Sequence, residues 1–185
     1  MTRDPKANPA PLPLTAAEDR QTLLRTAYGR FPSGVVAVAA MEDGRPLCMV
    51  ASSFVAVSMD PALVAFCVQW TSKTWPRLTR APRLGISVLG DAQDGAARRL
   101  ASRDESKFDA IAHCATAEGA VFIEGAAAWF DCSIADVLDA GDHGFVLLAL
   151  ESLSISPAVE PLVFHGSEFR RLGVRDLDRT ALKSG

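Results

Sequence analysis

The sequence predicts a mainly β protein, in which an antiparallel barrel is flanked by a few short helices. Apolar runs rich in Val and Ala are separated by polar turns that contain Gly, Pro or Asp, which is the pattern of β-strands joined by tight connections. Helical patterns occur between only some of these runs. Because strand and helix do not alternate regularly, a parallel sheet is not favoured. The length of 185 residues fits one domain with a sizeable core.

The composition excludes several classes of protein. Hydrophobic residues make up 49% of the chain and charged residues 22%, as in globular rather than disordered proteins. The net charge of -3 argues against nucleic-acid binding, which normally needs a concentrated basic face. No apolar run reaches the length of a membrane span, and the N-terminus lacks the pattern of a signal peptide. We therefore expect a cytoplasmic protein that does not associate with membranes.

Neither the cysteines nor the histidines form a metal-binding pattern. The four cysteines include no Cys-x-x-Cys pair, which disfavours a zinc site and a redox dithiol. Each cysteine lies among apolar residues and is interpreted as a buried free thiol in a reducing compartment. The three histidines are too scattered to suggest a metal centre. These residues are Cys48, Cys67, Cys114, Cys132, His113, His143 and His165.

The folded domain is predicted to span residues 15–172. Residues 1–14 are rich in Pro and are predicted to form a disordered tail, because this composition buries too little surface to offset its ordering entropy. Residues 173–185 form a second, polar tail. At the start of the domain, Thr15 and Glu18 match a capping box and predict a helix that ends near Gly29.

Strands follow this helix. The segment "GVVAVAAMEDGRPLCMVAS" has two apolar runs around the Asp43-Gly44 turn, which predicts a hairpin. Next come "FVAVS", a turn at Asp60-Pro61, and "ALVAFCV", a continuous apolar run that predicts a strand buried on both faces.

The middle of the chain alternates between short helices and strands. "TSKTWPRLTRAP" predicts a short helix with Thr74 as N-cap, Pro76 in its first turn and Pro82 at its end. "RLGISVL" predicts a strand. "DAQDGAARRLASR" predicts a helix, since its first turn is acidic and its last turns are basic.

The last third of the chain again predicts strands. After an irregular segment around "DESKFDAIAHC", the stretch "AAAWFDCSIADVLDAGDHGFVLLALESLSIS" predicts two long strands joined at residues 139–142. A final strand is predicted in "PLVFHGSEFRRL".

The common nucleotide and hydrolase motifs are absent from the sequence. There is no Gly-x-Gly-x-x-Gly after a first strand and no Gly-Lys-Ser/Thr phosphate loop, so Rossmann and P-loop binding have no support. No Gly-x-Ser-x-Gly elbow occurs either, which leaves a hydrolase without a nucleophile motif.

An ordered series of short motifs resembles the flavin reductase family, the reductase partners of two-component flavin-dependent monooxygenases. The series is "FPSGVVAVAA", "ASSFVAVSMDPALVAFCV", "SKTW", "ISVL", "SKF", "GDH" and "PLVFHGSEFRRL". It covers roughly residues 24–172. The resemblance implies an FMN-binding split β-barrel, typically a homodimer. It implies hydride transfer from NADH or NADPH to FMN or FAD, followed by release of the reduced flavin to a separate monooxygenase.

The resemblance also implies a set of flavin-binding residues. Backbone groups and hydroxyls of a first segment, residues 48–53, would approach the flavin ring. A second segment, residues 67–69, would lie alongside it, and a third, residues 72–74, would meet the phosphate. An arginine of the following helix would lie near the phosphate end. These residues are Cys48, Met49, Val50, Ala51, Ser52 and Ser53, then Cys67, Val68 and Gln69, then Ser72, Lys73 and Thr74, and finally Arg99.

The nicotinamide side is implied by two later motifs. His143 of the Gly-Asp-His turn would position the nicotinamide by hydrogen bonding. The late aromatic segment would contribute Phe164, His165, Gly166 and Phe169. No metal is implied.

Three points stay open from the sequence. Ser87 and Leu100 stand where the family usually has Asn and Phe, which affects the choice between FMN and FAD. Ser52 and Ser53 are compatible either with a turn whose hydroxyls bond to backbone or with ligand binding. The alternative functions are a flavoprotein with tightly bound FMN that acts in electron transfer or direct substrate reduction, and a non-catalytic flavin-binding module.

Overall fold

A computed structural model describes residues 10–16, 18–104 and 106–173 of the chain. Most of the two predicted tails, residues 1–9 and 174–185, lies outside the described residues.

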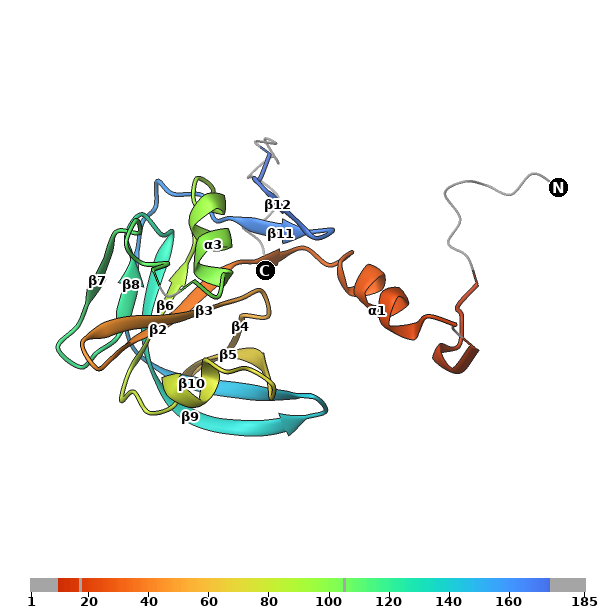
Figure 1. Cartoon of the computed structure of the whole chain (residues 1–185), viewed down its shortest axis with the longest axis horizontal. Coiled ribbons are helices and arrows are strands. Elements are labelled where there is room, and N and C mark those ends of the chain that lie inside the picture. Colours follow the sequence, from red (N-terminus) through yellow and green to blue (C-terminus); the bar gives the residue numbers. More distant parts are fainter. Residues whose placement is uncertain (1–9, 17, 105, 174–185) are drawn as a thin grey trace.

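The described chain contains few helices and many strands (Figure 1). The helical elements are a 3-10 turn at Leu14–Ala16, α1 (Arg20–Tyr28), α2 (Trp75–Leu78) and α3 (Asp94–Ala101). The first strands are β1 (Ser33–Gly34), β2 (Val36–Glu42), β3 (Arg45–Ala51), β4 (Val55–Met59), β5 (Ala62–Gln69) and β6 (Leu84–Val88). The later strands are β7 (His113–Ala115), β8 (Val121–Ile123), β9 (Ala128–Ala140), β10 (His143–Ile155), β11 (Val163–His165) and β12 (Glu168–Arg170).

Seven strands form one antiparallel sheet in the order β3-β2-β6-β9-β10-β5-β4. Its inner face contributes to a single core, in which Val38 of β2 and Leu47 of β3 cluster with Phe66 of β5 and Val146 of β10. Because strands from both halves of the sheet share this core, the sheet must curl around it. Within the described residues, the edge strands β3 and β4 follow one another in sequence but form no ladder with each other. The predicted mainly β architecture is therefore confirmed, and the barrel is split between β3 and β4.

A second core lies behind β2 and β3. Ala37 and Cys48 are buried there against Leu100 of α3, Ile123 of β8 and Leu162, which precedes β11. α3 and the C-terminal strands thus cover the outer face of this part of the sheet (Figure 1).

The two predicted hairpins are confirmed. At the β2–β3 turn, Asp43 and Gly44 have φ of 49° and 76°, which suits the two-residue turn that joins antiparallel strands. β9 and β10 pair along most of their length, from Ala140 opposite His143 to Ala128 opposite Ile155.

Two hairpins were not predicted: one lies in the predicted final strand, and the other lies near the segment predicted as irregular. The predicted final strand is wrong: it is two short strands, β11 and β12, because Gly166 and Ser167 adopt φ of 60° and 65° and reverse the chain. β11 also pairs with β1. The region around the segment predicted as irregular contains the β7–β8 pair, which turns through Gly119 at φ 92°. These strands have three residues each, too few to show alternation in sequence.

The first helix begins later than the capping box predicts. Thr15 lies in the 3-10 turn, and Asp19 is the N-cap of α1, with its carboxylate accepting a hydrogen bond from the Thr22 amide at 3.0 Å. No residue of α1 is buried, and α1 extends away from the barrel (Figure 1). No helix within the described residues is long and apolar enough to cross a membrane.

Candidate active site

Two of the predicted flavin segments and the Gly-Asp-His turn meet where β3, β5 and β10 end. In the ladder between β5 and β10, His143 pairs with Gln69. The Trp70 amide, just beyond β5, donates to the Asp142 carbonyl at 3.2 Å. The sequence separates these residues by more than seventy positions, so only the β5–β10 pairing brings them together.

Ser53 joins the first segment to the second. Its hydroxyl accepts a hydrogen bond from the Cys67 amide at 2.9 Å and donates to the Cys67 carbonyl at 3.2 Å. The open question over the two serines therefore has a different answer for each. Ser53 bonds to backbone, whereas Ser52 is exposed and its hydroxyl has no hydrogen-bond partner among the described residues.

The side chains of β3 point into the two cores rather than toward a ligand. Met49 and Ala51 belong to the core inside the barrel, whereas Cys48 and Val50 pack into the core beneath α3. Burial raises the pKa of the Cys48 thiol to about 12, so this thiol is protonated and unreactive at neutral pH. What β3 offers a ligand is its backbone.

The cysteine prediction holds in part. All four cysteines are free, and Cys48 and Cys132 are buried. The prediction is wrong for Cys114, which is exposed, and Cys67 is only partly buried. Cys114 lies in β7, which has only three residues. An alternating pattern of apolar residues over so short a strand does not indicate which face is buried.

Lys107 belongs to the "SKF" motif, but the sequence alone predicted no role for it. Its ammonium donates to the Cys48 carbonyl at 2.8 Å and to the Leu100 carbonyl at 3.0 Å. Arg99 in turn donates to the Lys107 carbonyl at 3.1 Å and to the Ser106 carbonyl at 3.3 Å. Arg99 and Lys107 therefore connect α3 and the following loop to β3, and the Arg99 guanidinium is partly engaged by the protein's own backbone.

The predicted phosphate segment precedes α2. Thr74 is the N-cap residue, as predicted, although its side chain makes no capping hydrogen bond. Ser72 supplies the side-chain hydrogen bond at this helix start, because its hydroxyl accepts from the Trp75 amide at 3.1 Å. α2 has only four residues, so its dipole adds little and Lys73, which is exposed, is the main positive group of this segment.

α2 is tied to the barrel by an ion pair. Arg77 donates through Nε to both carboxylate oxygens of Glu42, at 2.8 Å and 3.1 Å, and through Nη2 to one of them. This hydrogen bond lowers the pKa of Glu42, more than the Arg77 charge does and against the opposing effect of desolvation. The α2 end of β2 is therefore fixed relative to the segment that carries Ser72 and Lys73.

His143 is oriented by its neighbour. Its Nδ1 lies 2.7 Å from Asp142 Oδ1, and this hydrogen bond lowers the pKa of the Asp142 carboxyl. The His143 side chain is 34% exposed. Trp70 packs next to it: a Cβ at Gly144 would lie 2.5 Å from the nearest ring atom of Trp70. The sequence did not predict Trp70 as part of the site. Gly144, directly after His143, was the feature that could have indicated a large side chain packed against this position.

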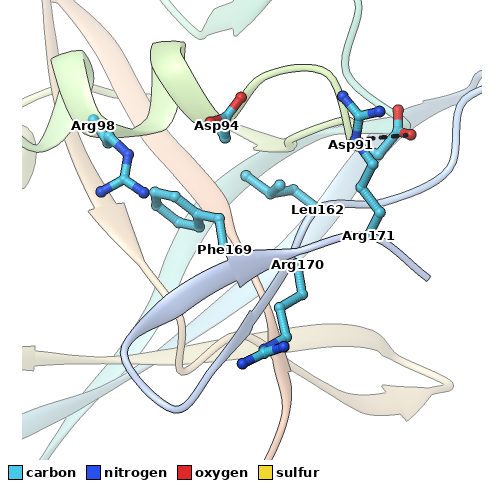
Figure 2. Close-up of a pocket in the computed structure, with 7 residues that line it drawn as sticks. All are labelled: Asp91, Asp94, Arg98, Leu162, Phe169, Arg170 and Arg171. Carbon is cyan, nitrogen blue, oxygen red and sulfur yellow. Dashed lines mark ion pairs between the residues drawn. The ribbon is translucent and has the colours of Figure 1, made fainter. Parts of the chain in front are cut away.

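The late aromatic segment lies elsewhere. Phe164, His165, Gly166 and Phe169 belong to the β11–β12 hairpin, which stands apart from the β9–β10 turn in Figure 1. The Phe164 and Phe169 rings are 5.5 Å apart, and the Arg98 guanidinium lies 4.9 Å above the Phe169 ring (Figure 2). No described hydrogen bond or strand pairing joins this hairpin to the β9–β10 turn.

Ser87 is buried and structural. Its hydroxyl accepts from the Ile123 amide at 2.9 Å, which connects β6 to β8. The hydroxyl that replaces the family's usual Asn is therefore used inside the protein. Among the described residues, no group of three or more His, Cys, Asp or Glu is placed to hold a metal ion.

Comparison with known proteins identifies the family. The model of the flavin reductase like domain matches residues 28–173. A flavin reductase of Pseudomonas putida is 39% identical over 142 residues, which cover 76% of this chain and 84% of the relative. HsaB, the reductase subunit of a flavin-dependent monooxygenase of Mycobacterium tuberculosis, is 34% identical over 158 residues, or 84% of each chain.

The fold agrees with solved structures of the same kind. The NADH:FAD oxidoreductase SgcE6 of Streptomyces globisporus, in complex with NAD and FAD fragments, has a TM-score of 0.80 and 36% identity. The match covers 87% of this chain and 96% of that chain. The chain therefore belongs to the flavin reductase family, as its ordered motifs predicted.

Proposed function

We propose that this member of the flavin reductase family is an NAD(P)H:flavin oxidoreductase that reduces FMN or FAD and supplies the reduced flavin to a separate monooxygenase. The observation that carries the proposal is the meeting of residues 48–53, residues 67–69 and His143 at one edge of the split barrel. Its relatives include a reductase subunit of a flavin-dependent monooxygenase, which supports the separate oxygenase partner.

The edge formed by β3 fits a flavin ring. β3 pairs only with β2 in the described sheet, so its other backbone edge is free of ladder hydrogen bonds, and Lys107 occupies the Cys48 carbonyl there. The pyrimidine part of a flavin carries both donors and acceptors, which such an edge complements. In this arrangement Ser52 offers a free hydroxyl, and Lys73 offers a cation for the phosphate.

The proposed site has a flavin side and a nicotinamide side. On the flavin side, backbone groups of the first two segments line the ring while their apolar side chains close the wall behind it. The flavin-side residues are Cys48, Met49, Val50, Ala51, Ser52, Ser53, Cys67, Val68, Gln69, Ser72, Lys73, Thr74 and Arg99. On the nicotinamide side, the residues are His143, Phe164, His165, Gly166 and Phe169.

His143 positions the nicotinamide in this proposal. Asp142 accepts the Nδ1 hydrogen, which leaves Nε2 as the ring nitrogen for a carboxamide. Bound flavin supplies the hydride-accepting chemistry, and the chain supplies position and exclusion of water.

The proposed assembly is a homodimer in the cytoplasm. Edge strand β4 exposes Val55, Val57 and Met59, of which Met59 is 94% exposed, and an uncovered apolar edge favours pairing with another chain. Free cysteines support a reducing compartment.

Steady-state kinetics tests the proposed function. The purified protein should oxidise NADH or NADPH faster when FMN, FAD or riboflavin is added, and this should hold after dialysis has removed any bound flavin. Absence of flavin-dependent oxidation of both nicotinamides would contradict the proposal and leave a binding module. A flavin that survives dialysis and is reduced in place would instead indicate a flavoprotein with a tightly held cofactor.

A further inference from the structure

A hollow of about 320 Å³ is lined by the end of α1 and the β11–β12 turn. Its volume lies at the lower end of the range for small-molecule sites. Three of its lining residues are basic and none is acidic. The lining residues are Arg25, Thr26, Gly29, Arg30, His165, Gly166 and Ser167.

The basic groups of this hollow form no hydrogen bond with a described residue, although the Arg25 charge helps to lower the pKa of Asp19 on the same helix. Among the described residues, neither the guanidinium groups of Arg25 and Arg30 nor the imidazole of His165 forms a hydrogen bond or an ion pair. Arg25 and Arg30 are exposed, so they are free to turn toward a ligand. Two forked guanidinium groups on one open hollow are suited to a phosphate, which accepts paired hydrogen bonds from arginine.

Another hollow, between α3 and the β11–β12 hairpin, shows the contrast (Figure 2). It measures about 160 Å³ and also has three arginines, but two aspartates line it as well. Arg98 lies over the Phe169 ring, Arg171 faces Asp91 at 3.9 Å, and Arg170 pairs with Glu168 at 3.0 Å. Its positive charge is therefore largely compensated by groups at the hollow itself, whereas the hollow beside α1 has no acidic lining residue, and its Arg25 interacts only with the more distant Asp19 charge.

The helix end that borders the larger hollow does not oppose an anion strongly. The last carbonyls of a helix carry partial negative charge, but here backbone amides occupy them. The Gly29 amide donates to the Arg25 carbonyl at 2.9 Å, and the Arg30 amide donates to the Ala27 carbonyl at 3.1 Å. The Gly29 carbonyl accepts from the Gly166 amide at 2.9 Å, which also fixes the β11–β12 turn against α1.

We propose that the hollow between α1 and the β11–β12 turn binds a phosphate group of the nicotinamide dinucleotide, held by Arg25 and Arg30. Ser167 adds a hydroxyl donor on the opposite wall. This inference rests on the proposed function, and it makes Arg25 and Arg30 determinants of nicotinamide binding. The phosphate is either the pyrophosphate, shared by NADH and NADPH, or the 2′-phosphate of NADPH alone.

The test is the double variant Arg25→Gln, Arg30→Gln of the full chain. We expect its KM for at least one nicotinamide to rise about tenfold or more, because each charge-assisted hydrogen bond contributes that order of affinity. A rise for NADPH alone assigns the 2′-phosphate, and a rise for both assigns the pyrophosphate. Calorimetric titration with 2′,5′-ADP and with 5′-ADP, in the absence of flavin, should show the same loss of affinity.

Arg20→Gln is the matched control, since Arg20 is an exposed arginine of the same helix outside the hollow. It should leave both KM values and both titrations unchanged. The inference is overturned if the double variant keeps both nicotinamide KM values within twofold of wild type, if only the flavin KM changes, or if Arg20→Gln has an equal effect. A wild-type protein that oxidises no nicotinamide in the presence of flavin would contradict the proposed function, and the ADP titrations would still test the phosphate site.

Discussion

The junction of β3, β5 and β10 differs from the hollow beside α1 in how its polar side chains are hydrogen-bonded. At the junction, the hydroxyl of Ser53 is bonded to Cys67, the hydroxyl of Ser72 to Trp75, and His143 to Asp142. In the hollow, the guanidinium groups of Arg25 and Arg30 form no hydrogen bond with a described residue. A preformed junction fixes the orientation of a ligand with little reorganisation, whereas free basic groups attract an anion over a distance and lose effect as salt rises. The difference suggests that one region orients a ring and the other captures a phosphate.

The largest effect is expected from His143→Ala. If the junction orients the nicotinamide, kcat/KM for NADH should fall about 10- to 100-fold, the size of one hydrogen bond to a polar group, while the flavin KM stays unchanged. His143→Gln should recover part of the loss, because its side-chain amide offers both an acceptor and a donor to a carboxamide. Steady-state kinetics at saturating flavin gives both values. A kcat/KM within twofold of wild type in His143→Ala would remove His143 from the site.

A pair of glycine substitutions distinguishes the two regions. Gly144→Ala should displace the Trp70 ring, because the new Cβ would lie 2.5 Å from it, and should destabilise the fold by about 1 to 3 kcal/mol. Gly166→Ala meets no atom within 4 Å but must adopt φ 60°, which costs about 1 to 2 kcal/mol.

Chemical denaturation measures both costs, and tryptophan fluorescence separates them. Trp70 is 44% exposed, so its emission should change in Gly144→Ala and stay constant in Gly166→Ala. Equal spectra in both variants would show that Gly144 does not support Trp70.

The smallest effect is expected at the two serines. Ser53→Ala removes both hydrogen bonds to Cys67 and should lower the free energy of unfolding by about 0.5 to 1.5 kcal/mol. Ser52→Ala should change it by less than about 0.5 kcal/mol, because its hydroxyl has no described partner. Ser52→Ala should instead raise the flavin KM. Urea unfolding and flavin titration of each variant test this division, and a Ser52→Ala variant with an unchanged flavin KM would assign both serines to structure.

Much of the fold followed from local patterns. The Asp43-Gly44 turn and the long β9–β10 hairpin were predicted because positive φ and alternation of apolar residues are encoded over a few neighbouring positions. The predicted start of α1 was wrong because Thr15 and Asp19 both suit an N-cap. The local sequence does not show which of the two begins the helix. The β11–β12 hairpin was missed because its strands have three residues each.

The candidate site was predictable as a set of segments but not as an arrangement. The motif order indicated residues 48–53, residues 67–69 and His143, and these do lie together. It also indicated the Phe164 to Phe169 segment, which the topology places on a separate hairpin. Lys107 was given no role because its bond to the Cys48 carbonyl spans 59 residues of sequence.

The sequence by itself determined the family, the strand pattern and the absence of a Rossmann, P-loop or hydrolase motif, because these depend on short-range periodicity and on motif order. The tertiary structure alone decided which hydroxyl is free, Ser52 rather than Ser53, and that the guanidinium groups of Arg25 and Arg30 border one hollow without a hydrogen bond to a described residue. Adjacent serines are equivalent in sequence. They become different only when β5 approaches Ser53, because a hydrogen bond requires a partner at about 3 Å and chain topology determines which partner that is.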